Sequence, residues 1–210
     1  MKYEFAGEEK SFLGITLKRI RAIRDIEKYG VKAGDVGGWI EKEENLSQSG
    51  NAWVYGDAQV YGDAWVYGNA QVCGNARVSG NAQVYGNAWV YGNAQVCCNA
   101  RVYGNAQVCC NARVCDYAQV CGDAWECSPL YIQGRIYSFS MCAKNKIKIG
   151  CQIHSFSAWE RNWKRIAKEN NFPKESWKEY ALYFNLACDL YGKEKYKIDL
   201  KEVECADDER

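Results

Sequence analysis

The chain has 210 residues, of which 48% are hydrophobic and 25% are charged, and this composition excludes an intrinsically disordered protein. Its 27 basic and 26 acidic side chains nearly cancel, so no overall field attracts nucleic acid or an anionic membrane. The sequence contains no run of eighteen apolar residues and no apolar signal segment at its N-terminus, so a cytoplasmic protein without membrane contact is expected.

Residues 1–44 form the first predicted domain, an N-terminal β cap. Lys2–Phe5 and Ile15–Arg24 alternate in the manner of strands, and Lys32–Gly38 is a turn-rich lead into Trp39-Ile40. The basic run inside Ile15–Arg24 is compatible with phosphate contact, but a solvated strand is the favoured interpretation.

Residues 45–128 form the second predicted domain, which is built from six-residue repeats. Asn45–Gly50 is interpreted as a degenerate unit, and Asn51–Ser128 contains thirteen regular units that begin NAWVYG, DAQVYG and DAWVYG. Each has Ala second and Val fourth, except for Glu126 in the last, and residues two apart on a strand share a face, so Ala and Val are predicted to point inward. The opening Asn or Asp tolerates a left-handed backbone and the closing Gly lacks a Cβ, so each unit is predicted to end in a corner.

This repeat resembles the hexapeptide-repeat, left-handed parallel β-helix family, in which a small residue, any residue and an aliphatic residue recur as in Ala52-Trp53-Val54. The resemblance implies a mainly β fold, a triangular solenoid in which one coil takes three units, or eighteen residues. Thirteen units then make a little over four coils, with a length of about 20 Å at the usual strand spacing.

An eighteen-residue coil distributes the outward third and fifth places of the units over three faces. The first face carries Trp53, Gln71, Trp89, Gln107 and Trp125 beside Tyr55, Cys73, Tyr91, Cys109 and Cys127. The second face, which is expected to be solvated, carries Gln59, Arg77, Gln95 and Arg113 beside Tyr61, Ser79, Cys97 and Cys115. The third face carries Trp65, Gln83, Arg101 and Gln119 beside Tyr67, Tyr85, Tyr103 and Cys121.

The aromatic side chains make the first and third faces candidates for contact with another molecule. The candidate binding residues are Trp53, Trp89, Trp125, Trp65, Tyr67, Tyr85, Arg101 and Tyr103. In the alternative and favoured interpretation, these aromatic side chains stack on one another and are covered by the terminal domains or by a second subunit.

The twelve cysteines are expected to be mostly free thiols, because no export signal accompanies them. Cys97 with Cys115, and Cys109 with Cys127, fall on successive coils at a spacing of about 5 Å, which permits a disulfide. No metal site is expected, because the cysteines lie in columns and no Cys-x-x-Cys pair occurs, and no cofactor is predicted.

Residues 129–210 form the third predicted domain, a small α+β domain that begins where the six-residue period ends. Two sets of alternating residues around Lys144-Asn145 predict a β-hairpin, namely Tyr137, Phe139 and Met141, then Ile147, Ile149, Cys151 and Ile153. Two helices are predicted, from about Ser157 to Asn170 and from near Pro173 to Gly192. Their buried residues are expected to be Trp159, Trp163, Ile166, Trp177, Ala181, Phe184, Cys188 and Tyr191.

A second resemblance concerns the ends of the chain. Gly34–Ser47 and Ile149–His154, with a following Trp, resemble phage- and prophage-encoded proteins of gut bacteria that have the same order of cap, coil and α+β domain. This resemblance implies that the chain originates from a phage or prophage and is therefore located in the cytoplasm of the bacterial host. It implies little about an activity.

Catalysis is disfavoured by the sequence. The hexapeptide-repeat resemblance implies acyl transfer in trimers with a histidine base, but the one histidine, His154, lies beyond the repeats and no loop interrupts the coils to form a substrate pocket. Cys151 and His154 are disfavoured as a nucleophile and base, because three residues apart on an extended strand they point to opposite faces. A zinc hydrolase lacks a ligand set.

The favoured prediction is a non-enzymatic binding protein. In its concrete form it is a phage-type accessory protein that binds a host macromolecule, a protein or a ribonucleoprotein, for example as an inhibitor of a bacterial defence system. The alternatives are an acyltransferase of the hexapeptide-repeat class and a sponge that sequesters a nucleotide signal by stacking and Arg–phosphate contact. Self-association into dimers or trimers is expected through the aromatic faces.

Overall fold

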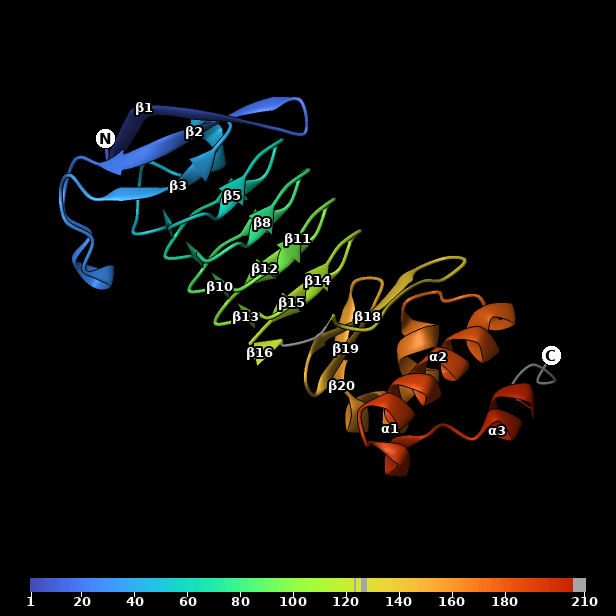
Figure 1. The fold of residues 1–210 in the computed structure, drawn as a ribbon. Coiled ribbons are helices and arrows are strands. Elements are labelled where there is room, and N and C mark those ends of the chain that lie inside the picture. The colour runs from blue at the N-terminus through green and yellow to red at the C-terminus, as the bar shows by residue number, and fades with distance from the viewer. Residues whose placement is uncertain (123, 126–127, 206–210) are drawn as a thin grey trace. The chain divides into compact units, whose positions relative to one another are not determined.

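The structure is a computed structural model that describes residues 1–122, 124–125 and 128–205, and it divides into two compact units, Met1–Pro129 and Leu130–Arg210 (Figure 1). In the described part of the chain, the first unit consists of strands and short 3-10 turns, and the second combines a sheet with helices. The predicted class, mainly β with a parallel solenoid and a C-terminal α+β region, is confirmed. Among the described residues, no helix is long and apolar enough to cross a bilayer.

Antiparallel strands and two 3-10 turns begin the first unit. They are β1 (Tyr3–Phe12), β2 (Ile15–Ala22), η1 (Glu27–Tyr29), β3 (Val36–Ile40) and η2 (Glu43–Asn45). Leu13 and Gly14, which both have positive φ, make the turn between β1 and β2. β3 pairs in parallel with β5, so that Ile40 lies beside Val60. The N-terminal strands thus extend one sheet of the coil, as Figure 1 shows, and cover an edge that a solenoid would otherwise expose.

The coil is built from strands of two or three residues, each contributed by one repeat unit. They are β4 (Trp53–Val54), β5 (Gln59–Val60), β6 (Trp65–Val66), β7 (Gln71–Val72), β8 (Arg77–Val78), β9 (Gln83–Val84), β10 (Trp89–Val90), β11 (Gln95–Val96), β12 (Arg101–Tyr103), β13 (Gln107–Val108), β14 (Arg113–Val114), β15 (Gln119–Cys121) and β16 (Ala124–Trp125). Three parallel sheets result, with the orders β5-β8-β11-β14 continuing from β3, β4-β7-β10-β13-β16, and β6-β9-β12-β15. From β4 to β13, each strand pairs with the strand three units further on, so the three-unit coil implied by the resemblance is confirmed.

The coil makes about five turns, more than the thirteen regular units provide. Two further sides of the coil precede these units, namely β3, which pairs with β5, and Leu46, which forms a parallel bridge with Val66. The thirteen units and these two sides make fifteen sides, or five turns of three sides each. The predicted register of the degenerate unit is therefore wrong, because it put Leu46 at a second place, whereas Leu46 lies opposite a fourth-place Val. Leu46 and Asn45 are both fully buried, and the Asn45 amide donates to the carbonyls of Gly62 and Ala64, both at 2.9 Å.

The core of the coil is the stripe of Ala and Val that the sequence predicted. From Ala52 to Val120, the second-place Ala and fourth-place Val side chains are no more than 1% exposed. Backbone hydrogen bonds join each coil to the next, as where the N–H of Trp53 donates to the carbonyl of Ala70 at 3.0 Å. A stripe this thin is buried only because successive coils cover each other.

The corners place the sixth residue of each unit in the left-handed region. The glycines there have φ values from 57° at Gly56 to 83° at Gly122, and a Cβ on Gly86 would lie 2.9 Å from the backbone nitrogen of Gly104. Glycine therefore suits these corners for both its conformation and its size. Cys98 (60°) and Cys110 (58°) are sixth-place residues that keep this conformation with a side chain.

The first-place Asn residues have a role other than the predicted one. Among the described residues, no first-place Asn of the repeats has a positive φ. Their side chains instead form ladders along the stack, in which the amide of Asn51 donates to Asn69 (2.8 Å), Asn69 to Asn87 (3.2 Å) and Asn87 to Asn105 (3.1 Å). The left-handed residue of the corner is the one before the Asn, and the Asn supplies coil-to-coil hydrogen bonds.

The last unit leaves the repeat register by one residue. Gln107 pairs with Ala124 and Val108 with Trp125, so Trp125 occupies the line of inward Val residues and is only 4% exposed. Its predicted outward position is therefore wrong. In the regular register the inward place would belong to Glu126, and an unpaired carboxylate costs much more to bury than an indole, whose single polar group is a neutral N–H.

The second unit combines a four-stranded antiparallel sheet with helices. Its elements are β17 (Tyr131–Gln133), β18 (Ser138–Ala143), β19 (Lys146–Ile149), β20 (Gln152–Ser155), α1 (Phe156–Glu169), η3 (Lys174–Ser176), α2 (Trp177–Leu190), η4 (Glu194–Tyr196) and α3 (Leu200–Cys205). The two predicted helices correspond to α1 and α2. Ser155 caps α1, because its hydroxyl accepts from the N–H of Ala158 at 3.2 Å.

The predicted β-hairpin with two helices is too simple for this unit. The described residues contain a third helix, α3, and the sheet order is β17-β18-β19-β20. The second predicted strand folds back on itself, because Gly150, with φ of 56°, makes a turn that pairs β19 with β20. The alternation of apolar residues continues from Ile147 through this turn to Ile153, so the sequence pattern does not show that one strand ends and another begins.

Candidate binding surfaces

Four of the predicted aromatic residues form one continuous stack on the third face, called here the third-face stack: Trp65, Tyr67, Tyr85 and Tyr103. The ring centroids of Trp65 and Tyr67 are 4.0 Å apart, those of Tyr67 and Tyr85 4.9 Å, and those of Tyr85 and Tyr103 5.3 Å. The planes of the two tyrosine pairs differ by 8° and 9°. The parallel pairing of β6, β9 and β12 sets this spacing, because tyrosines in consecutive coils lie one strand separation apart.

The end of this stack at Trp65 is open to solvent. Trp65 is 43% exposed although its indole stacks on Tyr67. Burial, and then the neighbouring Tyr85, raise the pKa of Tyr67, while the charge of Arg101 acts in the opposite direction. Arg101 is therefore near the stack, as predicted, and its side chain is exposed.

The first face is not an open column of tryptophans, and at Trp53 it agrees with the favoured interpretation that a terminal segment covers these aromatic side chains. Trp53 is only 1% exposed, because Tyr3 packs edge-on against it with a centroid distance of 6.4 Å and Gly37 leaves no room beyond its ring. Trp125 is buried by the register change. Trp89 is 38% exposed, lies 4.5 Å from the ring of Tyr91 and donates its indole N–H to the Cys73 sulfur at 3.1 Å.

The second face is partly covered by the N-terminal strands, contrary to its predicted solvation. Phe12 packs against Tyr61 with a centroid distance of 5.6 Å, and the guanidinium of Arg77 lies 5.0 Å from the Phe12 ring. Trp39 of β3 is covered by two cations, because the ammonium of Lys10 lies 4.1 Å and the guanidinium of Arg19 lies 4.9 Å from the centre of its ring. Basic residues of β1 and β2 are thus used for cation–π contacts within the unit.

The cysteine columns contain free thiols where the structure describes both neighbours. Cys97 and Cys115 are free although they lie in consecutive coils. Burial, and then the neighbouring Asp116, raise the pKa of Cys115 to about 11, which keeps this thiol protonated and a poor nucleophile near neutrality. The Cys109–Cys127 pair lies outside the described residues because of Cys127. Among the described residues, no cluster of three or more His, Cys, Asp or Glu side chains is arranged to hold a metal ion.

His154 is packed against an aromatic ring. It lies edge-on to Trp159 with a centroid distance of 5.1 Å and a plane angle of 90°, and its Nε2 is 3.4 Å from Oε1 of Gln152. Cys151 lies in the turn between β19 and β20, whereas His154 lies in β20. The prediction that both residues lie on one extended strand is therefore wrong.

Sequence reasoning missed a cavity in the second unit. The cavity has a volume of about 130 Å³ and lies between the β19–β20 turn, α1 and α2. Its lining includes Trp159, Trp163, Trp177 and Phe184, which the helical pattern predicted as ordinary core. The signal that was overlooked is the presence of three tryptophans on two adjacent helices.

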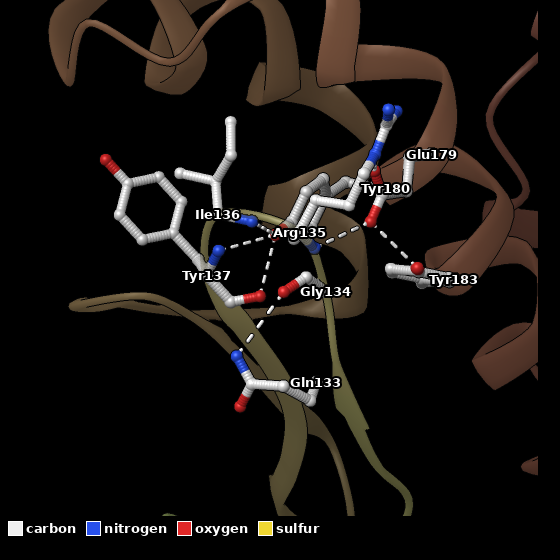
Figure 2. Close-up of polar contacts among 8 residues, drawn as sticks. All are labelled: Gln133, Gly134, Arg135, Ile136, Tyr137, Glu179, Tyr180 and Tyr183. Carbon is white, nitrogen blue, oxygen red and sulfur yellow. Dashed lines mark hydrogen bonds and ion pairs between the residues drawn. The ribbon is translucent and has the colours of Figure 1, made fainter.

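One wall of this cavity is held by the clasp in Figure 2, in which residues 134–137 are tied to α2. The backbone N–H of Tyr137 donates to the Tyr180 hydroxyl at 2.6 Å, and this hydroxyl donates to the Tyr137 carbonyl at 2.7 Å. Arg135 adds an ion pair to Glu179 at 2.6 Å. The clasp fixes Tyr137, whose ring stacks on Phe172 at 5.4 Å, and both residues line the cavity.

Comparison with known proteins concerns the coil. The family model described as YdcK β-solenoid repeat matches residues 58–71, 70–84, 82–98 and 94–110. A protein of Escherichia coli (strain K12), described as uncharacterized acetyltransferase YdcK, is 37% identical over 62 residues, which are 26% of this chain and 18% of the E. coli protein. The matched repeats form stacked parallel coils with an Ala and Val interior, so the coil of this chain is a parallel β-helix of the hexapeptide-repeat type, as the resemblance implied.

Proposed function

We propose that this chain is a non-catalytic protein-binding module, whose coil presents flat indole rings to a partner protein. The observation that carries the proposal is the geometry of Trp65 and Trp89. Each indole lies against the tyrosine two residues further along the chain, yet 43% of Trp65 and 38% of Trp89 is exposed. Their orientation is set before binding, so little side-chain entropy is lost on contact.

A protein partner accounts for these faces better than a nucleic acid. Tryptophan is enriched among the residues that contribute most binding energy at protein interfaces. The third-place column of the third face offers one basic residue, Arg101, among Trp65, Gln83 and Gln119, and the chain's net charge is +1. Phosphate backbones are bound by clusters of cations, which this column does not supply.

The proposal in its finer form is a phage-type accessory protein that inhibits a component of a bacterial host, for example a defence protein. The resemblance of Gly34–Ser47 and Ile149–His154 supports this form, and the identity of the partner tests it.

The test is recovery of the tagged chain from bacterial lysate, followed by native mass spectrometry. The wild type is expected to carry a stoichiometric partner, a chain with Trp65→Ala and Trp89→Ala to lose it, and a Gln107→Ala control on the first face to keep it. Equal denaturation midpoints for the variants would show that the loss is not unfolding. A partner that remains on the double variant contradicts the proposal.

The second candidate function is acetyl transfer, which the name of the E. coli relative favours. The packing of the one histidine, His154, against Trp159 is an argument against a general base there. Calorimetric titration with acetyl-CoA decides between the two. We expect no saturable heat of acetyl-CoA binding. Saturable binding, together with an acetyl transfer that the His154→Ala variant loses, would favour the enzyme.

A further inference from the structure

The cavity of the second unit has the size of a single aromatic ring. Its volume is about 130 Å³, and an engineered cavity of roughly 150 Å³ with an apolar lining binds benzene. Cys151 and Asn170 line the cavity and are exposed, so the cavity reaches the surface beside them. A small molecule can therefore enter without the unit unfolding.

The lining is mostly apolar and carries no charge. Among the residues that the structure describes, none of those lining the cavity carries a charged side chain. The indole N–H of Trp159 donates to the Ile147 carbonyl at 3.0 Å, and that of Trp177 to the Phe172 carbonyl at 3.1 Å. These donors are already used by the protein, so a charged ligand would lose its hydration without replacement.

The walls favour a planar ring. Trp163 and Trp177 meet edge to face at 5.4 Å and 89°, and Phe172 and Tyr180 do the same at 4.8 Å and 83°. These pairs offer both ring faces and ring edges, which are the two surfaces that an added aromatic ring packs against. The lining also includes the small residues Ala167 and Ala181, one helical turn after Trp163 and Trp177, whose short side chains leave space beside the aromatic rings.

Gln152 and Asn170 form a polar pair among the lining residues. The amide of Gln152 donates to Oδ1 of Asn170 at 2.7 Å, and the amide of Asn170 donates to the Ile166 carbonyl at 2.8 Å. Because Asn170 is exposed, this pair lies near the surface. A hydroxyl or other neutral polar substituent on the ring is compatible with it, whereas the pair brings no counter-charge for an ion.

We propose that the second unit is a binding site for a small, uncharged, single-ring aromatic molecule, held between α1, α2 and the β19–β20 turn. The site is independent of the proposed protein-binding faces, since all of its lining residues belong to the second unit.

The test is titration of the full chain with toluene, benzyl alcohol and benzoate, followed by the indole N–H signals in a ¹⁵N NMR spectrum. The eight tryptophans give few enough signals for Trp159, Trp163 and Trp177 to be assigned by substitution with Phe. Toluene and benzyl alcohol are expected to shift the signals of these three residues to saturation. Benzoate, which has the same ring and a charge, is expected to bind at least about tenfold more weakly, a difference of about 1.4 kcal/mol.

Variants locate the site. Ala181→Leu fills the cavity from α2 and is expected to weaken toluene binding at least tenfold, whereas Leu182→Ala changes an exposed neighbour on the same helix and is expected to leave it unchanged. If Ala181→Leu does not fold, Trp163→Ala replaces it. That variant enlarges the cavity and is expected to shift the preference from toluene toward the two-ring naphthalene.

Three results would overturn the proposal. Indole signals of the three tryptophans that stay unmoved up to the solubility limit of toluene would make the cavity a packing defect. Equal affinities for benzoate and benzyl alcohol would contradict an uncharged site. Unchanged toluene affinity in Ala181→Leu, or an unchanged ligand preference in Trp163→Ala, would place the binding elsewhere.

Discussion

The ring of Tyr85 lies 4.9 Å from that of Tyr67 in the preceding coil, with planes 8° apart. This contact shows how an outward residue of a solenoid acquires a structural role, because a side chain repeated at one place in each coil meets its own copy at the strand spacing. At the end of the stack, Trp65 lies against Tyr67 and remains 43% exposed.

Tyr85 contacts a ring on each side, so its loss should destabilise the coil. Tyr85→Ala is expected to lower the free energy of unfolding by roughly 1–3 kcal/mol, since aromatic pairs contribute about 0.5–1.5 kcal/mol each. Tyr85→Phe keeps both ring contacts and is the matched control. Denaturant titration with hydrogen exchange in residues 51–122 measures the difference, and equal midpoints for the Ala and Phe variants would contradict a structural role for the stack.

Cys98 occupies a corner with φ of 60°, where the other coils mostly have Gly. Cys98→Gly is expected to raise the free energy of unfolding by roughly 1 kcal/mol, because it removes the cost of a Cβ in left-handed backbone. Gly86→Ala is the converse change and should destabilise, since its Cβ would lie 2.9 Å from a backbone nitrogen. Thermal unfolding of both variants tests this, and destabilisation by Cys98→Gly would show that its thiol contacts outweigh the strain.

Lys2 is fully buried, and its ammonium donates to the Ala52 carbonyl at 2.6 Å. Burial, and then the charge of Arg24, lower its pKa from 10.5 to about 8. Between about pH 8 and 10.5 the unfolded chain holds this proton more tightly than the folded chain does, so stability should rise with pH across this window. Below about pH 8 both states are protonated and the full penalty remains.

Comparison with Lys2→Met isolates this effect from the titration of other groups. The unfolding free energy of the wild type minus that of Lys2→Met, measured in urea at pH 7, 8, 9 and 10, should stay level up to about pH 8 and then increase. A difference that does not change between pH 8 and 10 would mean that Lys2 keeps an ordinary pKa.

Tyr180 and Arg135 both belong to the clasp in Figure 2, but they should differ in their contributions to stability. Tyr180→Phe removes the hydroxyl that pairs with both the N–H and the carbonyl of Tyr137, which are part-buried, and the loss of the two hydrogen bonds is expected to be about 1–3 kcal/mol. Arg135→Ala removes an ion pair whose arginine is 74% exposed, which should cost at most about 1 kcal/mol. Hydrogen exchange in β18 reports the stability of this unit, and a larger effect of Arg135→Ala would reverse the ranking.

The sequence by itself determined the coil, because its cause is local and repeated. Ala at every second place and Val at nearly every fourth specify an inward stripe, and a six-residue period with sixth-place Gly specifies the corners. The boundaries of α1 and α2 were likewise predictable from apolar periodicity, the N-terminal Pro and the C-terminal Gly.

Only the tertiary structure decided which aromatic residues remain exposed. Trp53 and Trp89 occupy the same place in identical NAWVYG units, but residues some fifty positions away in sequence, Tyr3 among them, bury Trp53 and leave Trp89 exposed. Burial by a distant segment leaves no trace in the repeat. The cavity of the second unit is hidden for the same reason, since its empty space depends on how α1, α2 and the β19–β20 turn pack, whereas each helix alone shows an ordinary apolar stripe.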